Sequence, residues 1–131
     1  MRKFIILTSH KLVEEQIVDA KDRYGVQEFV YLPTELQSLW SNVPADLDSL
    51  ENYSKPLKSW LEDVTHQGDV VMIQGDFGLS YNLIDYAKSL GLVTVYATTK
   101  RDSVEKDGVK ISIFKHIRFR EYREYREETM S

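Results

Sequence analysis

Short apolar runs alternate with amphipathic stretches along most of the chain. Four runs are typical of strands, at residues 3–7, 28–32, 70–73 and 92–97, and the third is apolar at every position, as in a strand buried on both faces. Apolar residues at helical spacing predict helices over residues 12–24, 34–42, 54–67 and 79–90. Strands that alternate with helices pair in parallel through right-handed crossovers, which predicts a three-layer, Rossmann-like α/β domain with a mainly parallel sheet flanked by helices.

Turn residues set the expected boundaries. Gly25 ends the first helix, and Ser54 is expected to cap another that carries Pro56 in its first turn. Asp107-Gly108 lies between apolar residues and predicts a C-terminal β-hairpin. Its alternating Val109, Ile111 and Ile113 would pack on the sheet edge or form a dimer interface. The charged residues 120–131 are expected to fray.

Size and composition narrow the class of protein. A chain of 131 residues fits one domain, residues 1–131, and no apolar run is long enough to span a bilayer. The chain has no cysteine, which suits the cytoplasm and removes thiolate chemistry. A net charge of −4 argues against a general binder of long nucleic acids. The charge is uneven, because residues 100–131 hold nine Lys/Arg and seven Asp/Glu.

A Gly-rich turn, Gln74-Gly75-Asp76-Phe77-Gly78, joins the apolar strand 70–73 to the helix that follows. Such turns let backbone N–H groups approach an anion at a helix N-terminus, although they also serve simply to reverse the chain. Ligands of open parallel sheets bind outside the carboxyl ends of the strands. That rule gathers this turn with three other segments at one edge, namely Thr8-Ser9-His10, Leu32-Pro33-Thr34 and Thr98-Thr99-Lys100-Arg101.

The residues expected at this edge favour a ligand that carries phosphate. Arg101 offers a planar fork for phosphate oxygens and Lys100 a point charge. Phe77 and Tyr81 would stack on a base, although each is also common as a packed side chain. Thr8 and Ser9 would donate hydroxyl hydrogen bonds or cap the first helix instead.

The residues expected at this edge are suited to cleavage of an RNA-like phosphodiester. The ribose 2′-OH attacks its own 3′-phosphate when binding imposes in-line geometry, so the protein supplies positioning and charge. Arg101 and Lys100 rank first as catalytic residues, and His10 or His116 would carry a proton. Asp76 is the only carboxylate expected in the cleft and ranks after His10 as a catalytic residue. The three histidines lack metal-binding spacing, so no metal or other cofactor is expected.

Four segments resemble a small CRISPR-associated accessory family, Csx twenty, which is associated with type III CRISPR systems. They are Met1 to His10, Ile73 to Gly78, Val95 to Arg101 and Phe114 to Tyr122. The resemblance implies a single CARF-like domain, a Rossmann-like sensor of cyclic oligoadenylates that forms a homodimer. It implies a ring nuclease that opens cyclic tetra-adenylate into linear di-adenylates with 2′,3′-cyclic phosphate ends, which switches antiviral signalling off.

The resemblance also implies a role for each segment. Thr8, Ser9 and His10 would lie under the ring, residues 74–77 would contact its phosphates and riboses, and residues 98–101 would form the catalytic edge. His116 and Arg118 would reach in as a lid or across the dimer. The candidate ligand-binding residues are therefore Thr8, Ser9, Gln74, Gly75, Phe77, Gly78, Thr98, Thr99, His116 and Arg118.

Two other functions stay open. The same cleft would bind the ring without cutting it, since the sequence has no clear acid–base pair. A nucleotide-binding regulator of another kind has the same pattern of elements, because the fold does not determine the function.

Overall fold

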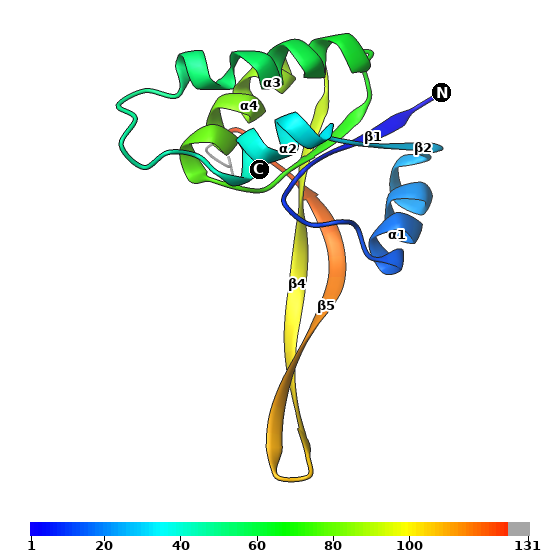
Figure 1. Ribbon diagram of the computed structural model, residues 1–131. Helices are drawn as coiled ribbons and strands as arrows, with labels where there is room; N and C mark the ends of the chain where they lie inside the picture. The colour runs from blue at the N-terminus through cyan, green and yellow to red at the C-terminus, as the bar shows by residue number, and fades with distance from the viewer. Residues whose placement is uncertain (126–131) are drawn as a thin grey trace.

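A five-stranded sheet with the order β2-β1-β3-β4-β5 forms the centre of the computed structural model, which describes residues 1–125 (Figure 1). The first four strands are parallel to one another, and β5 is antiparallel to β4. The prediction of an α/β fold with helices flanking a mainly parallel sheet is confirmed. The elements are β1 (Lys3–Leu7), α1 (Glu14–Tyr24), β2 (Glu28–Tyr31), α2 (Thr34–Ser41), α3 (Glu51–Val64), β3 (Val70–Ile73), α4 (Phe77–Ser89), β4 (Val93–Lys106) and β5 (Val109–Glu121).

Two separate apolar cores cover the two faces of the sheet. Successive strand side chains point to opposite faces, so Ile5 and Ile73 pack toward α2, α3 and α4, whereas Phe4 and Met72 pack toward α1. All four positions of β3 are buried, as its unbroken apolar run predicts. The molecule is therefore layered as helices, sheet and helix. Within residues 1–125, no helix is long and apolar enough to cross a membrane.

Two predicted helix boundaries can be compared with the structure. Gly25 ends α1 in the left-handed conformation, at φ 65°, as expected. Ser54 is not a helix cap: α3 begins three residues earlier, at Glu51, and Ser54 is buried inside it with its hydroxyl donating to the Glu51 carbonyl. Pro56 consequently lies in the helix interior.

The structure also differs from the prediction in the C-terminal part of the chain. Strand β4 does not end at Ala97 but continues as one strand to Lys106, where Asp107 and Gly108 turn the chain into β5. Residues 120–122 are not frayed, because β5 runs to Glu121 and the Tyr122 hydroxyl donates to the Ile73 carbonyl at 2.6 Å. The predicted fraying of residues 126–131 lies outside the described residues.

The outer halves of β4 and β5 form a two-stranded ribbon that projects from the body, called the arm below and defined as residues 99–116 (Figure 1). Parallel pairing of β4 with β3 ends at Val95, so the arm has no third strand beside it. A register shift at Thr98 and Thr99 marks its base. The packing of Val109, Ile111 and Ile113 on the sheet edge, one of the two expectations for them, is wrong, because all three are exposed on the arm.

Candidate functional site

Gln74 links three strands at the edge where β1 and β3 end and β4 continues. Its backbone N–H donates to the Leu7 carbonyl at 2.9 Å, and its side-chain oxygen accepts from the Ala97 N–H at 2.7 Å. The amide side chain therefore continues the pairing of β3 with β4 by one step beyond the end of β3. Trp40 of α2 donates its indole N–H to the Gln74 carbonyl at 3.2 Å. Gln74 was expected to contact a ligand, but most of its polar groups are already occupied by these bonds.

Gly75 is required by the close approach of an indole ring. A Cβ built at this position would lie 2.8 Å from two atoms of the buried Trp40 ring. The sequence offered a different reason for this glycine, namely access of a ligand to the backbone. Gly78 lies in the first turn of α4, where a Cβ would meet the end of Leu50 at 3.2 Å and lie in ordinary contact with an Asp76 carboxylate oxygen at 3.5 Å.

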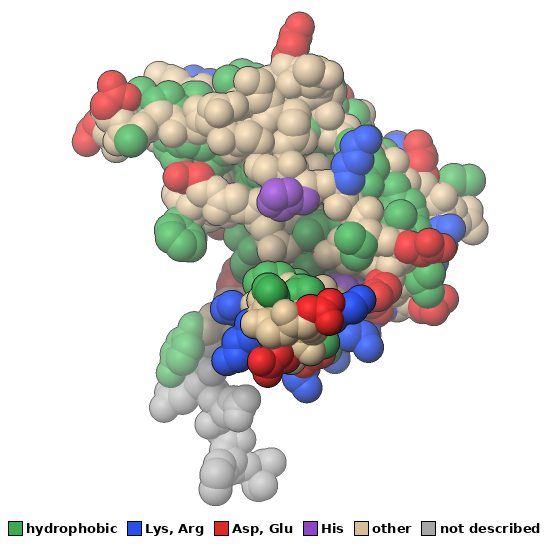
Figure 2. Space-filling model, turned by 60° about the horizontal axis from the view of Figure 1, so that its bottom comes forward, with side chains coloured by type: hydrophobic (Ala, Val, Ile, Leu, Met, Phe, Trp, Pro, Cys, Tyr) green, Lys and Arg blue, Asp and Glu red, His purple; other side chains and the backbone are tan. Residues whose placement is uncertain are grey.

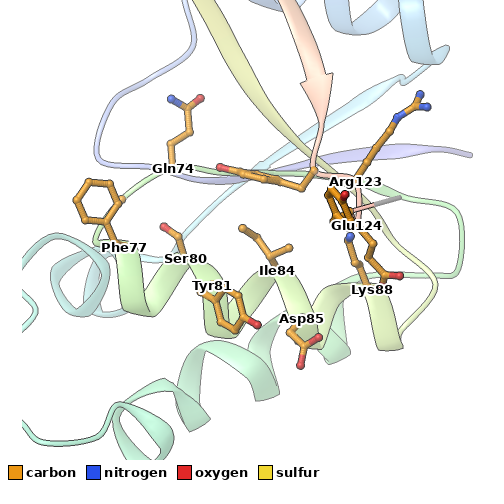
Figure 3. Close-up of a pocket in the computed structure, with 12 residues that line it drawn as sticks. Gln74, Phe77, Ser80, Tyr81, Ile84, Asp85, Lys88, Arg123 and Glu124 are labelled. Carbon is orange, nitrogen blue, oxygen red and sulfur yellow. The ribbon is translucent and has the colours of Figure 1, made fainter. Parts of the chain in front are cut away.

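A cleft of about 790 Å³ opens between α4 and the segment that follows β5 (Figure 3). We call it the aromatic cleft, because Phe77, Tyr81 and Tyr125 line it. These three residues are 95%, 77% and 92% exposed, respectively. Ser80 also lines it, and its buried hydroxyl has no hydrogen-bond partner in the described part of the chain. Lys88 and Arg123 lie at the end of the cleft away from Phe77 (Figure 3). The remaining lining residues are Gln74, Gly75, Ile84, Asp85, Tyr122 and Glu124.

A second hollow of about 780 Å³ adjoins the first along β5 and the end of α1. It contains four arginines and one glutamate, and we call it the arginine groove. Arg120 lies over the ring of Tyr96, 5.7 Å from its centre, and donates to the Tyr96 hydroxyl at 3.1 Å. Tyr122 and Arg123 line both hollows. The groove is lined by Arg23, Tyr24, Tyr96, Arg118, Phe119, Arg120, Glu121, Tyr122 and Arg123.

The four predicted catalytic residues do not share a site in one chain. Lys100 and Arg101 lie on the arm rather than in a loop at the sheet edge, because β4 continues through them. The Arg101 guanidinium donates twice to the Ser112 hydroxyl on the neighbouring strand, at 3.1 and 2.9 Å. His10 is exposed after β1. Asp76 caps α4, since its carboxylate accepts from the Leu79 N–H at 3.0 Å, so this predicted catalytic residue has a structural role.

The predicted ligand-binding residues fall into separate groups. Gln74, Gly75 and Phe77 line the aromatic cleft, and Arg118 lines the arginine groove. The others face neither hollow. Thr8 is buried, and Ser9 shares a hydrogen bond with Ser41 at 2.9 Å rather than capping α1. The Thr98 hydroxyl donates to the Arg118 carbonyl across the strands, and Thr99 begins the arm.

His116 is not a lid. Its side chain is only 4% exposed, and its Nε2 lies 2.8 Å from an Asp19 carboxylate oxygen, which ties β5 to α1. The His116 ring also packs on Phe119, with ring centres 4.9 Å apart. This histidine therefore stabilises the base of the arm.

The Asp19 carboxylate makes the stability of this junction depend on pH in the acidic range. Burial by itself raises the pKa of Asp19, but the hydrogen bonds from His116 and Arg23 and the Arg23 charge outweigh it, so the pKa lies below its usual 3.8. A lowered folded-state pKa gives stability that is complete above the unfolded value and is lost as the pH falls through the folded one. We expect Asp19→Asn to reduce the loss of stability that the wild type shows below about pH 4 in urea unfolding.

Asp22→Asn is the matched control for this prediction, because Asp22 is exposed on the same helix. Its unfolding midpoint should follow the wild-type pH curve. Parallel curves for the wild type and Asp19→Asn would contradict the assignment.

The sequence did not single out the distal half of the aromatic cleft. Ser80, Ile84 and Lys88 are spaced four residues apart, which places them along one side of α4, so helical periodicity was the available signal. The sequence of residues 123–125 does not indicate that they line a cleft, because they lie near α4 only as a result of the position of Tyr122. Among residues 1–125, no three His, Asp or Glu side chains gather as they would to hold a metal ion.

Comparison of this sequence with known proteins identifies a family that it matches. The family model described as "Uncharacterized protein MJ1673 family" matches residues 2–120. The chain is 49% identical over 129 residues to "Uncharacterized protein MJ1673" of Methanocaldococcus jannaschii, an alignment that covers 95% of this chain and 100% of that protein. No solved structure matches the chain. The matched residues include the whole of the arm, most of the arginine groove and the loop at Gln74, and the chain belongs to the MJ1673 family.

Proposed function

We propose that the protein binds a cyclic oligoadenylate across the aromatic cleft and the arginine groove and cleaves it as a CARF-like ring nuclease. The observation that carries binding is the junction of the two hollows at Tyr122 and Arg123. A nucleotide needs a face for its base and cations for its phosphate, and the two hollows offer these side by side. The resemblance of the chain to the CRISPR-associated family supports cyclic tetra-adenylate as the ligand.

The aromatic side supports recognition of a base. Phe77 and Tyr81 are one helical turn apart on α4, and both rings are largely exposed without packing in the core. A base stacked on such a ring gains about 1–3 kcal/mol. The Ser80 hydroxyl, which has no hydrogen-bond partner within residues 1–125, lies between them along the cleft and would bond to a ring nitrogen or a ribose hydroxyl of the ligand (Figure 3).

The arginine side supports recognition of phosphate. Arginine presents a planar fork that matches two phosphate oxygens, and several arginines together accommodate the charges of an oligonucleotide ring. Arg123 is the most available of them, since its side chain is 82% exposed and its carboxylate partner Glu121 is 3.8 Å away. Local cations of this kind let a chain of net charge −4 bind a polyanion.

Cleavage would follow from in-line geometry imposed on the bound ring. The 2′-oxygen of one ribose forms a bond to the adjacent phosphorus while the bond from phosphorus to the 5′-oxygen breaks. The 2′-hydroxyl proton ends on the 5′-oxygen, so the products are a 2′,3′-cyclic phosphate and a 5′-hydroxyl. Arg118, Arg120 and Arg123 would stabilise the charge that develops on the phosphate oxygens.

The deciding experiment incubates the protein with labelled cyclic tetra-adenylate in excess EDTA and separates the products. We expect linear di-adenylate with a cyclic phosphate end, and about tenfold weaker binding by Arg123→Gln, because a charged hydrogen bond to phosphate is lost. Lys110→Gln, on the tip of the arm, is the control and should bind as the wild type does. An intact ring that runs free of the protein would overturn the proposal.

A non-catalytic binding protein is the second candidate. The observation that favours it is the separation of His10, Asp76 and Lys100 in the structure, which leaves no assembled acid–base pair from the predicted set. An intact ring that co-elutes with the protein after long incubation would select this function. Stabilisation by mononucleotides but not by cyclic oligoadenylates would select a different nucleotide-binding role.

A further inference from the structure

The arm carries an apolar face that nothing in the described chain covers. Paired residues of an antiparallel ribbon share a face. Three successive pairs lie on the same side of the arm, namely Asp102 with Ile113, Val104 with Ile111, and Lys106 with Val109. Their four β-branched side chains, Val104, Val109, Ile111 and Ile113, are between 45% and 60% exposed. They form one continuous apolar strip.

The opposite face of the arm is different in character. Its successive pairs are Glu105 with Lys110, Ser103 with Ser112, and Arg101 with Phe114. The charges and hydroxyls there are suited to water, and Arg101 both bonds to Ser112 and lies over the Phe114 ring. The arm thus has the polarity of a sheet with one solvated and one buried face.

A free ribbon of this kind is poorly stable. Two strands without further packing are marginal in water, and a contiguous exposed apolar patch marks a surface that another molecule covers. The arm also stands clear of the body, which leaves its apolar strip accessible to a second molecule (Figure 1).

We infer that the apolar strip of the arm is the surface through which two copies of this chain associate. Charge complementarity points to a second copy as the occupant. The arm holds five Lys/Arg and three Asp/Glu, whereas the rest of the chain holds twelve and eighteen, so a cationic arm meets an acidic body in its partner. Figure 2, which looks toward the end of the arm, shows Lys and Arg side chains on its flanks.

A nucleic acid fits this strip less well than a protein surface does. Asp102 lies at the end of the apolar side nearest the body, and Glu105 and Asp107 lie near the tip, and these carboxylates would repel phosphates. A duplex also offers little apolar surface to cover four aliphatic side chains. Association through the strip does not depend on the proposed nuclease activity, because no strip residue lines either hollow.

The test is the mass of the full-length protein in solution, by sedimentation and by light scattering. We expect a particle of twice 15.3 kDa for the wild type. The double variant Val104→Thr with Ile111→Thr keeps the β-branched shapes but removes apolar surface from both strands. Its dimer dissociation constant should rise at least tenfold, and higher salt should weaken the wild-type dimer.

The matched control is Glu105→Thr with Lys110→Thr, a cross-strand pair on the opposite face that leaves the net charge unchanged. It should remain dimeric. A wild type that is monomeric up to about 100 μM would overturn the inference, as would a dimer that the strip variant does not weaken while its circular dichroism is native. A monomer that binds a short nucleic acid duplex through the arm would assign the surface to that partner instead.

Discussion

Replacing Gly75 by alanine is expected to destabilise the fold by about 2–3 kcal/mol, because overpacking a rigid interior forces its neighbours to move. The new Cβ would lie 2.8 Å from the Trp40 ring, which is 1% exposed and held by its bond to the Gln74 carbonyl. Neither the ring nor the backbone is free to shift without breaking that bond. Thermal unfolding should therefore occur about 8–12 °C lower than in the wild type.

Two comparisons isolate this cause. Gly78→Ala, three residues along, meets the flexible end of Leu50 and an Asp76 oxygen at an ordinary contact distance, and it gains helix propensity, so its stability should be equal or slightly higher. Trp40→Leu removes all three ring atoms that the new Cβ would meet, so a double variant with Gly75→Ala should lose less stability than the sum of the two single changes. Additive losses would show that Gly75 is needed for another reason.

Removing the exposed rings of the aromatic cleft is expected to weaken ligand binding without unfolding the protein. Phe77→Ala and Tyr81→Ala should each raise the dissociation constant for cyclic tetra-adenylate about 5- to 100-fold, because a stacked base loses its platform. Both side chains are mostly exposed, so the core that α4 forms with the sheet stays intact. Calorimetric titration measures the affinity, and unfolding measures the stability.

Phe114→Ala is the matched control for these rings. Phe114 is 68% exposed on the solvated face of the arm, away from both hollows, so its removal should leave the affinity at the wild-type value. Equal affinity for all three variants and the wild type would move the ligand away from α4.

Much of the fold could be predicted from periodicity because the sheet is buried on both faces. An apolar run such as residues 70–73 has no alternative to a central strand, and Gly25 ends a helix that its own spacing defines. A serine two residues before a proline resembles a helix cap, but Ser54 is buried inside a helix that begins earlier, at Glu51. Here packing outweighed local preference.

The site was harder to predict because its position depends on where β4 ends. Thr98 to Arg101 carry polar side chains after an apolar strand, which is typical of a loop at the sheet edge. Pairing with β5 keeps these residues extended, and this pairing is set by residues more than ten positions away. The positions of Phe77 and Tyr81, one turn apart, were predictable, since they depend only on the local helix.

The open sides of the arm restrict the kind of assembly that the protein can form. Both strands of the arm present unpaired backbone N–H and C=O groups along their outer edges, and edge-to-edge pairing of such strands has no natural end. Lys100, Lys106, Lys110 and Lys115 place positive charge along these edges, and repulsion between like charges opposes their alignment. Growth into fibrils is thereby disfavoured, whereas reciprocal contact, in which the aliphatic strip of each arm packs against the body of the other subunit, closes after two subunits.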